Sequence, residues 1–282
     1  MTPLPATVAG LLALAQALGV ERVDAQQLLT HQLHCSRAWL LAHDTDPLPS
    51  DRAASLVQAL QRCAAGEPLA YVLGEQAFHG LLLQVSPAVL IPRADTETLV
   101  DWALELLLTG PLQNEPAPEV GDLGTGSGAI ALAVKRACPR ARLRASDSSA
   151  DALAVAQTNA ARLGLEVDFL TGDWWQPWAT PPLHLALSNP PYIAAGDAHL
   201  AGLTHEPAQA LVPPGEDGLS ALRQLATGAR EALRPGGWLL LEHGHDQAAA
   251  VAALLRARGY AQVQHRLDRG GRQRCTGASW PG

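Results

Sequence analysis

The sequence predicts an α/β protein in which a small all-helical N-terminal domain and a β-hairpin linker precede a doubly wound, mostly parallel sheet of seven strands. Before about residue 75, apolar residues recur at the spacing of buried helix faces. From residue 119 onward, short apolar runs alternate with helical runs, which is typical of a parallel sheet with helices on both faces. The hydrophobic fraction of 48% and the charged fraction of 17% leave enough apolar material for such cores.

The first two predicted regions span residues 1–75 and 76–94. Apolar stripes at helical spacing, such as the one between Leu11 and Leu18, predict a helical bundle in the first. The second changes to strand-like runs at 78–85 and 89–91, and the Ser86-Pro87 pair between them indicates a turn. We therefore expect the second region to be a β-hairpin that links two domains.

The third predicted region spans residues 95–282. It opens with a helix that Asp95 or Thr96 caps, and a proline-rich surface loop follows at 109–118. Its expected helices include 129–137 and 150–163. Its expected strands cover 119–123, 141–146, 166–170, 183–188, 237–242, 261–267 and 273–278. In doubly wound sheets ligands bind beyond the carboxyl ends of the strands, so the residues that follow the first four strands are the candidate site.

Composition excludes several classes of protein. The 20 Lys and Arg residues against 27 Asp and Glu give a net charge of −7, which disfavours bulk nucleic-acid binding. No apolar run approaches the length of a membrane span, and no basic residue precedes the first apolar stretch as in a secretory signal, so we expect a cytoplasmic protein. The four cysteines form no Cys-x-x-Cys pair, and the histidine pairs lack carboxylate or cysteine partners, so no metal site is expected. Lys135 is the single lysine, and no ATPase phosphate loop is present.

A glycine-rich turn follows the first expected strand and opens a helix. It reads Gly124-Thr125-Gly126-Ser127-Gly128, and such glycines let the backbone approach a ligand closely. Asp147 follows the next strand, where a carboxylate can hold ribose hydroxyls. Both features predict a nucleoside-bearing cofactor, but they fit a dinucleotide as well as other nucleosides.

The third strand leads into Asp173, Trp174 and Trp175. A carboxylate and an indole at this edge can bind an adenine by hydrogen bonding and packing. Alternatively, the two indoles cap the hydrophobic core.

The fourth strand ends in Asn189-Pro190-Pro191-Tyr192. The two prolines stiffen the backbone, so the Pro190 carbonyl and the Asn189 amide oxygen form a fixed pair of acceptors. Such a pair suits a planar NH2 group, because gripping both N–H bonds orients a poorly nucleophilic lone pair toward an electrophile. Tyr192 can form a wall for the planar group. A simple tight turn after the strand is the alternative.

These motifs resemble the class I S-adenosylmethionine-dependent methyltransferases that act on planar nitrogens. Further stretches at 91–97, Glu206-Pro207 and 239–244, together with the helical N-terminal region, resemble the HemK/PrmC family of peptide chain release factor glutamine N5-methyltransferases. The resemblance covers essentially the whole chain. It implies methyl transfer from S-adenosylmethionine to the side-chain amide of the glutamine in the Gly-Gly-Gln motif of bacterial class I release factors.

The same resemblance implies roles for particular residues. The loop Gly124 to Gly128 surrounds the methionine part of the cofactor, Asp147 binds its ribose, and Asp173 and Trp174 lie at its adenine. The glutamine is held by Asn189, Pro190, Pro191 and Tyr192, with Asn189 also beside the cofactor, and with Arg93 and Glu97 on the substrate side. The helical domain is expected to grip the protein substrate, and the enzyme is expected to be a monomer. Three residues depart from the family pattern, namely Ala94, Gly121 and His205.

Other functions remain open from the sequence. An adenine-N6 methyltransferase uses the same acceptor logic, although the acidic balance and the lack of a basic recognition domain count against it. A glutamine of a ribosomal protein is a second acceptor. A catalytically silent binding module and an NAD-dependent dehydrogenase are further alternatives, and the dehydrogenase has no obvious use for Asn189 to Tyr192.

Overall fold

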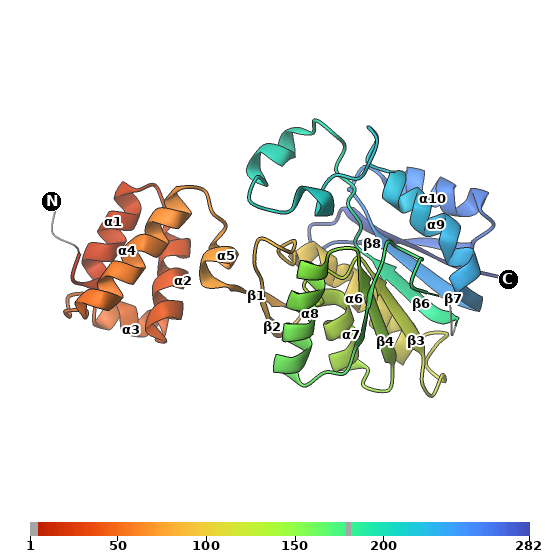
Figure 1. The fold of residues 1–282 in the computed structure, drawn as a ribbon, viewed down its shortest axis with the longest axis horizontal. Coiled ribbons are helices and arrows are strands. Elements are labelled where there is room, and N and C mark those ends of the chain that lie inside the picture. The colour runs from red at the N-terminus through yellow and green to blue at the C-terminus, as the bar shows by residue number, and fades with distance from the viewer. Residues whose placement is uncertain (1–4, 179–181) are drawn as a thin grey trace. The chain divides into compact units, whose positions relative to one another are not determined.

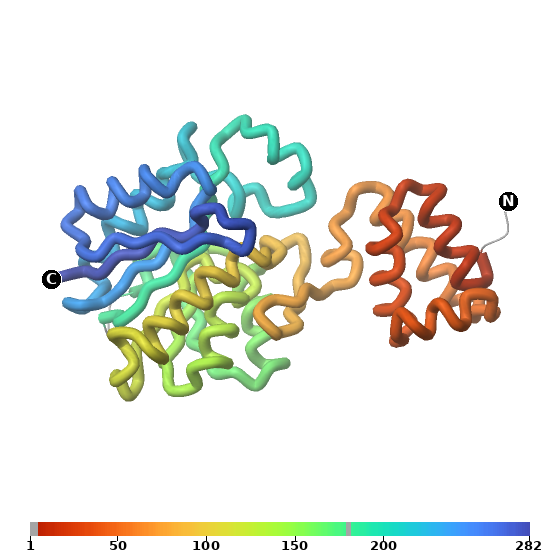
Figure 2. The backbone as a smooth tube through the Cα atoms, turned by 180° about the vertical axis from the view of Figure 1, so that it is seen from behind, coloured from red at the N-terminus to blue at the C-terminus, as the bar shows by residue number. Residues whose placement is uncertain are grey.

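Two units make up the chain, Met1–Glu75 and Gln76–Gly282, and the computed structural model describes residues 5–178 and 182–282 (Figures 1 and 2). Residues 1–4 of the predicted helical domain thus lie outside the described residues. The described part of the first unit carries five helices: α1 (Val8–Ala17), α2 (Arg22–Leu33), α3 (Arg37–Ala42), α4 (Ser50–Ala64) and α5 (Leu69–Leu73).

Local signals set the ends of these helices. The Thr7 hydroxyl accepts the Gly10 N–H at 3.1 Å before α1, and Ser36 caps α3 in the same way through the Trp39 N–H. The helices bury one apolar core that includes Leu11 and Leu28, as the helical spacing predicts. Trp39, by contrast, is 37% exposed and stacks on His43.

The hairpin lies earlier in the chain than the sequence predicts. Strand β1 (Glu75–Phe78) pairs with β2 (Leu81–Gln84), and residues 89–91 are not part of a strand, so the predicted strand there is wrong. The chain does turn at Ser86-Pro87, where the Val89 N–H donates to the Ser86 carbonyl at 3.0 Å, but this turn does not connect the two strands of the hairpin. The actual turn is His79-Gly80, with φ of 45° and 74°. A two-residue hairpin turn of type I′ has positive φ at both central positions, a conformation that glycine adopts freely and histidine rarely. Because histidine is uncommon in such turns, the sequence does not predict a turn at His79-Gly80.

The second unit contains a seven-stranded sheet in the order β5-β4-β3-β6-β7-β9-β8. All neighbouring strands are parallel except that β9 runs antiparallel to both β7 and β8. This confirms the predicted doubly wound, mostly parallel fold. The strands are β3 (Glu119–Leu123), β4 (Arg142–Asp147), β5 (Asp168–Thr171), β6 (Leu183–Ser188), β7 (Leu233–Glu242), β8 (Ala261–Leu267) and β9 (Gln273–Ser279).

Strand boundaries differ modestly from those predicted. The largest difference is at β7, which begins at Leu233 instead of residue 237. Leu183 pairs with Leu233 before a register shift leads into the main pairing of Leu185 with Trp238. Sequence pattern does not reveal such an irregular first pairing, because Pro235 and the two glycines after it read as a loop.

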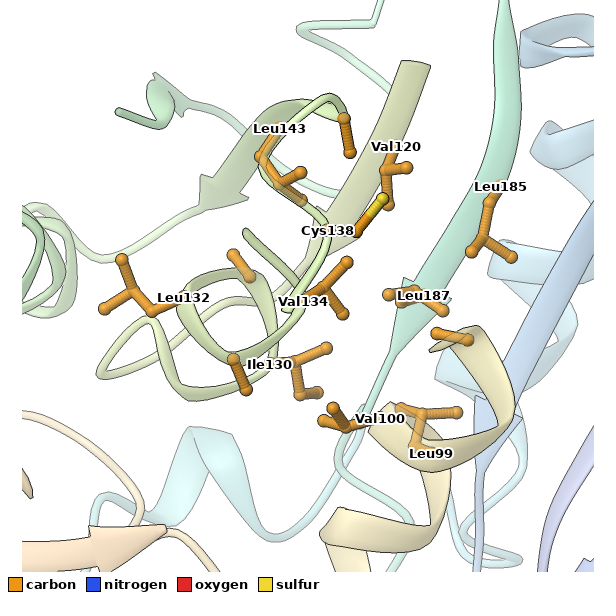
Figure 3. Packing of buried hydrophobic residues seen from close by; sticks show 14 of the residues in the cluster. Leu99, Val100, Val120, Ile130, Leu132, Val134, Cys138, Leu143, Leu185 and Leu187 are labelled. Atoms are coloured by element: carbon orange, nitrogen blue, oxygen red, sulfur yellow. The ribbon is translucent and has the colours of Figure 1, made fainter. Parts of the chain in front are cut away.

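Helices cover both faces of the sheet (Figure 1). On one face α6, α7 and α8 bury a cluster that Figure 3 shows from close by, with Val100 and Ile130 packed among Val120, Leu185 and Leu187. On the other face α9 and α10 pack on a second cluster that contains Leu239 and Leu241. The helical segments of the unit are η1 (Ala94–Thr96), α6 (Glu97–Leu108), α7 (Ala129–Ala137), α8 (Ala150–Leu163), η2 (Ala198–Gly202), η3 (Ala208–Ala210), α9 (Ser220–Ala232) and α10 (Ala248–Ala257).

Gly121, one of the three departures from the family pattern, lies in the middle of β3. A Cβ on it would come within 2.7 Å of both the Trp178 ring and Leu183. Trp178 is buried and its indole N–H donates to the Ser146 hydroxyl at 3.1 Å. Glycine at position 121 therefore makes room for a large aromatic side chain in the core.

Candidate active site

A cavity opens at the carboxyl ends of β3, β4, β5 and β6, where the winding of the sheet reverses direction. The empty space in this cavity is about 970 Å³, a figure that includes open solvent at its mouth. The predicted site residues that line it are Arg93, Gly124, Thr125, Gly126, Ser127, Asp147, Asp173, Trp174, Asn189 and Pro191. Gly128, Pro190, Tyr192 and Glu97 lie outside this lining.

The glycine loop between β3 and α7 forms the floor. Gly124 and Gly126 have φ of 74° and 56°, and Gly128 adopts the same left-handed region immediately before α7. The N–H groups of Gly124 and Thr125 both donate to the Ser146 carbonyl at 2.9 Å, which ties the loop to β4. A Cβ on Gly126 would meet nothing within 4 Å, so the backbone here is open to a ligand.

Asp122 anchors this loop from below. Its Oδ2 accepts the Thr125 hydroxyl at 2.6 Å and the Ala131 N–H at 3.2 Å, so it holds both the loop and the first turn of α7. The side chain is fully buried, and burial raises its pKa to about 7, with the nearby Asp147 acting in the same direction. Asp122 therefore fixes the geometry of the loop.

Asp147 ends β4 with both carboxylate oxygens directed by backbone donors. Oδ2 accepts the Gly126 N–H and Oδ1 accepts the Ser149 N–H, each at 2.9 Å. Each oxygen retains a lone pair that can accept a hydroxyl proton. This pre-oriented carboxylate at the cavity wall suits a pair of ribose hydroxyls.

The two tryptophans after β5 have different positions. Trp174 lines the cavity with φ of 44°, and its ring passes over Gly124, where a Cβ would lie 3.3 Å from the indole. Trp175 packs on the core and donates its indole N–H to the Leu225 carbonyl at 3.0 Å. One indole thus lies where a planar base could stack, and the other caps the core.

The chain after β6 carries Asn189 and Pro190, the residues that the sequence predicts as an acceptor pair. Ser188 is fully buried and donates its hydroxyl to the Leu123 carbonyl at 2.7 Å, which joins β6 to β3 at the edge of the cavity. Asn189 lines the cavity, and its Nδ2 donates to the Thr96 hydroxyl at 3.1 Å. The amide oxygen of Asn189 is therefore on the side away from Thr96.

Tyr192 is not among the residues that line the cavity. Its hydroxyl donates to Glu242 Oε1 at 3.3 Å and its ring packs against the second core cluster. Burial raises the pKa of Tyr192 well above its ordinary value. Its carbonyl accepts Gln247 Nε2 at 2.9 Å, and a Cβ on Gly218 would come within 2.3 Å of this carbonyl. The backbone of the Asn189–Tyr192 turn is thereby held from several elements.

The predicted substrate-side residues form ion pairs. Arg93 lines the cavity and pairs with Glu206, whose buried carboxylate also accepts the Ile91 N–H at 3.1 Å. Glu97 pairs with Arg269 at 2.6 Å and accepts the His79 N–H at 2.9 Å. Glu97 therefore supports the hairpin and the turn between β8 and β9, while Arg93 is at the cavity wall.

Four residues with a supporting part in the site were not predicted as site residues from the sequence: Thr96, Asp122, Asn159 and Glu242. Asn159 on α8 donates to the Ser127 carbonyl at 2.9 Å and accepts the Gln84 N–H, so it joins the glycine loop to β2. For Asp122 and Glu242, the only feature of the sequence that could have indicated a role in the site is their position beside predicted elements. Asp122 immediately precedes the glycine loop, and Glu242 ends a predicted strand.

The donor and acceptor set fits a nucleoside-bearing cofactor. A glycine-rich backbone loop, an oriented carboxylate and a half-buried indole lie at the ends of three adjacent strands, β3, β4 and β5. In the part of the chain that the structure describes, no cluster of three or more His, Cys, Asp or Glu side chains could hold a metal ion. No described helix has the length and apolar character to cross a membrane.

Two family models match the chain, the PrmC N-terminal domain over residues 8–74 and the methyltransferase small domain over residues 96–225. A curated relative from Bordetella pertussis, named release factor glutamine methyltransferase, is 50% identical over 92% of this chain and 95% of its own length. A relative of the same name from Xylella fastidiosa (strain Temecula1) is 46% identical over 99% of this chain and 100% of its own. A solved methyltransferase structure from Pyrococcus furiosus is similar in fold, with a TM-score of 0.54 and 18% identity over 83% of this chain and 100% of that one.

Proposed function

The chain belongs to the family of release factor glutamine methyltransferases, and from this premise we propose that its methyl acceptor is the glutamine of the Gly-Gly-Gln motif in bacterial class I peptide chain release factors. The enzyme is an S-adenosylmethionine-dependent glutamine methyltransferase. The observation that carries the proposal is the orientation of Asn189, whose Nδ2 is bound to Thr96 so that Oδ1 is free to accept.

We propose that the glycine loop, Asp147 and Trp174 hold the cofactor. The loop approaches the methionine part, the Asp147 carboxylate accepts the ribose hydroxyls, and the Trp174 indole and Asp173 lie at the adenine. S-adenosylmethionine, when bound, supplies an electrophilic methyl group on a sulfonium centre. The fit rests on the unobstructed backbone at Gly126 and on the close passage of the Trp174 ring over Gly124.

The protein's own part in the reaction is to position the acceptor. Asn189 Oδ1 and the Pro190 carbonyl each accept one N–H of the glutamine amide, which fixes the plane of the amide and aims its nitrogen. Positioning of this kind can lower a barrier by about 7–11 kcal/mol when the reacting atoms are held in line. No strong base is needed, because an amide nitrogen that is methylated while it keeps both protons is very acidic and loses one to water.

We further propose that the first unit, residues 1–75, recognises the release factor, that residues 76–94 act as a linker, and that residues 95–282 carry the chemistry. The first unit has its own core and contributes no residue to the lining of the cavity. A monomeric, cytoplasmic enzyme is part of this proposal.

The test is to incubate the protein with methyl-labelled S-adenosylmethionine and a purified class I release factor, and then to analyse the Gly-Gly-Gln peptide by mass spectrometry. We expect one methyl group on the glutamine side chain, and none on a factor in which this glutamine is replaced by alanine. Parallel reactions contain ribosomal proteins and an adenine-containing oligonucleotide. Label on either of these and not on the release factor would refute the proposal.

A further inference from the structure

The side-chain amide of Asn189 has two nearly identical orientations that differ in chemistry. In one the oxygen is turned to the acceptor site, and in the other the NH2 group is. Only the first can accept an N–H from a substrate, because the NH2 group is a donor and would face another donor. Something outside Asn189 must select between them.

Thr96 makes the direct contact that distinguishes the two. Its hydroxyl accepts Asn189 Nδ2 at 3.1 Å, and Thr96 is only 4% exposed, so water does not easily replace it. A hydroxyl, however, can donate as well as accept. If its proton pointed to Asn189, it would bind the amide oxygen and the side chain would turn over. The direction of the Thr96 proton therefore decides which group Asn189 presents.

Glu242 can fix that direction. It is the last residue of β7, whose neighbour Leu241 is in register with Ser188, the residue before Asn189. It is 1% exposed, its Oε1 accepts the Tyr192 hydroxyl at 3.3 Å, and Thr96 is among the groups whose interaction lowers the pKa of its carboxyl against the effect of burial. Among the described residues, Oε2 has no hydrogen-bond partner. An ionised carboxylate only accepts, so it draws the Thr96 proton toward itself and leaves the Thr96 oxygen to accept from Asn189.

We propose that Glu242 and Thr96 are positioning residues that hold Asn189 with its amide oxygen toward the methyl acceptor. Neither residue needs to touch the substrate amide. The inference rests on the proposed function in one respect, since it takes an NH2-bearing acceptor to be bound at Asn189.

The charge state of Glu242 makes the orientation of Thr96 and Asn189 depend on pH. Burial raises the pKa of Glu242 to about 7. The groups that act on this carboxylate are Thr96 and Asp95 at η1, Tyr192 after β6, and Arg274 and Cys275 on β9. Arg274 favours the ionised form, although it also pairs with Asp95 at 3.0 Å and Asp268 at 3.3 Å. A protonated Glu242 can donate its proton to the Thr96 hydroxyl. The Thr96 hydroxyl then donates to Asn189, which turns the Asn189 NH2 group toward the acceptor site. Turnover is therefore expected to fall as Glu242 gains its proton.

The experiment compares Thr96→Val, Thr96→Ser and a control, Thr158→Val, whose hydroxyl is exposed on α8 and bonds only within its own helix. Methylation of a release factor gives kcat and KM, calorimetric titration gives the Kd for S-adenosylmethionine, and thermal unfolding gives Tm. We expect Thr96→Val to lower kcat by about 100-fold, as misplacement of a reacting group can, with KM and the cofactor Kd changed by much less. Thr96→Ser keeps the hydroxyl and restores most of kcat.

A second variant, Glu242→Gln, tests whether the Thr96 hydroxyl donates its proton to residue 242. The glutamine keeps the size of the side chain but brings an NH2 group that donates toward Thr96. We expect a lower kcat and the loss of the wild-type fall in kcat below about pH 7. A structural role alone would lower Tm without removing this pH dependence.

The outcomes separate two failures. A wild-type protein that leaves the release factor unmethylated refutes the proposed function and this inference with it. An active wild type together with a Thr96→Val variant of equal kcat refutes the inference alone. So does a Thr96→Ser variant as impaired as Thr96→Val, or a Glu242→Gln variant with the wild-type pH profile.

Discussion

At the scale of single residues, the site depends on groups held by hydrogen bonds to fixed partners. Asn189 is bound by Thr96 on one side, and Asp147 is bound by two backbone donors. Such groups need not reorganise when a substrate arrives, which is where much of the advantage of a preformed polar site comes from.

Removal of the Asn189 amide tests this directly. We expect Asn189→Ala to lower kcat about 10²- to 10³-fold, as the loss of one oriented polar group does elsewhere, while the Kd for S-adenosylmethionine stays close to wild type. Asn114→Ala in the loop before β3 is the matched control, because Asn114 is exposed and lies outside the cavity lining. Steady-state kinetics and calorimetric titration measure both quantities. Full activity of Asn189→Ala would contradict a role in holding the acceptor.

The raised pKa of Asp122 makes the free energy of unfolding depend on pH. Its folded-state pKa of about 7 lies above the ordinary 3.8, so the folded protein retains a proton that the unfolded chain has lost. Between these two values the folded state binds more protons, and the free energy of unfolding therefore decreases as pH rises. Each unit of pKa shift corresponds to roughly 1.4 kcal/mol.

Replacing Asp122 by Asn removes this titration. We expect the loss of unfolding free energy between about pH 5 and about pH 8 to be smaller in Asp122→Asn than in the wild type, by an amount on the order of a few kcal/mol. Urea unfolding at both pH values measures it. An unchanged pH dependence would mean that the Asp122 carboxyl is ionised in the folded protein.

Sequence alone could identify the residues that follow the strands, because each strand ends in a short polar motif at a predictable place. Asp147, Trp174 and Asn189 all line the cavity for this reason. It could not reveal Thr96 as the partner of Asn189. The two residues lie 93 positions apart, and threonine before a helix reads as an ordinary cap. The structure gives α6 no side-chain cap at Thr96, which leaves the hydroxyl for the site.

At the scale of elements, the turn from Asn189 to Tyr192 depends on close approach of a second loop. Gly218 has φ of 68°, and a Cβ there would lie 2.3 Å from the Tyr192 carbonyl. Backbone atoms cannot yield as a flexible side chain can, so a substitution at Gly218 must displace the turn.

We therefore expect Gly218→Ala to lower kcat at least about 10-fold through misplacement of the acceptor pair. Gly236→Ala is the matched control, because Gly236 has a similar φ of 80° but nothing within 4 Å of the added methyl group. Both variants bear the strain of a left-handed alanine, on the order of 1 kcal/mol, and only the first meets the turn. Equal kcat values for the two variants would show that the contact with Tyr192 is unimportant.

The elements that the sequence predicts best are those with a repeated pattern. The strands of the sheet and helices α7 and α8 were expected because short apolar runs alternate with helical runs along the sequence. These elements lie close to their predicted positions. The hairpin was misplaced because its turn uses a histidine at positive φ, and the start of β7 was missed because of its irregular pairing. Both errors concern single backbone conformations that side-chain type does not specify.

At the scale of the whole molecule, the two units have separate hydrophobic cores. The first is built of leucines, alanines and valines from α1 to α5, and the second unit has one cluster on each face of its sheet. The amino-acid sequence alone does not give the order of the strands in the sheet. In particular, it does not show that the last strand, β9, lies between β7 and β8.

Separate cores predict separable roles. We expect the fragment of residues 76–282 to bind S-adenosylmethionine with a Kd close to that of the full chain, because all residues that line the cavity lie within it. Its kcat/KM for a release factor should fall at least about 10-fold if the first unit supplies recognition. Calorimetry and kinetics on both proteins test this. A fragment that methylates the release factor as well as the full chain would contradict the recognition role.

Lys135 lies near the carboxyl end of α7, whereas the amino end of that helix meets the glycine loop, and its ammonium donates to the carbonyls of Pro139 and Ala141. Since no other lysine exists in the chain, reagents that cross-link amines can mark only this one side chain and the chain's α-amino group. Residues 5–75 contain no lysine, so a docking interface there offers these reagents no side-chain amine. Mapping the bound release factor therefore calls for carboxylate-directed or photoactivated chemistry, for which the aspartates and glutamates of α2, α4 and their connecting loops offer attachment points.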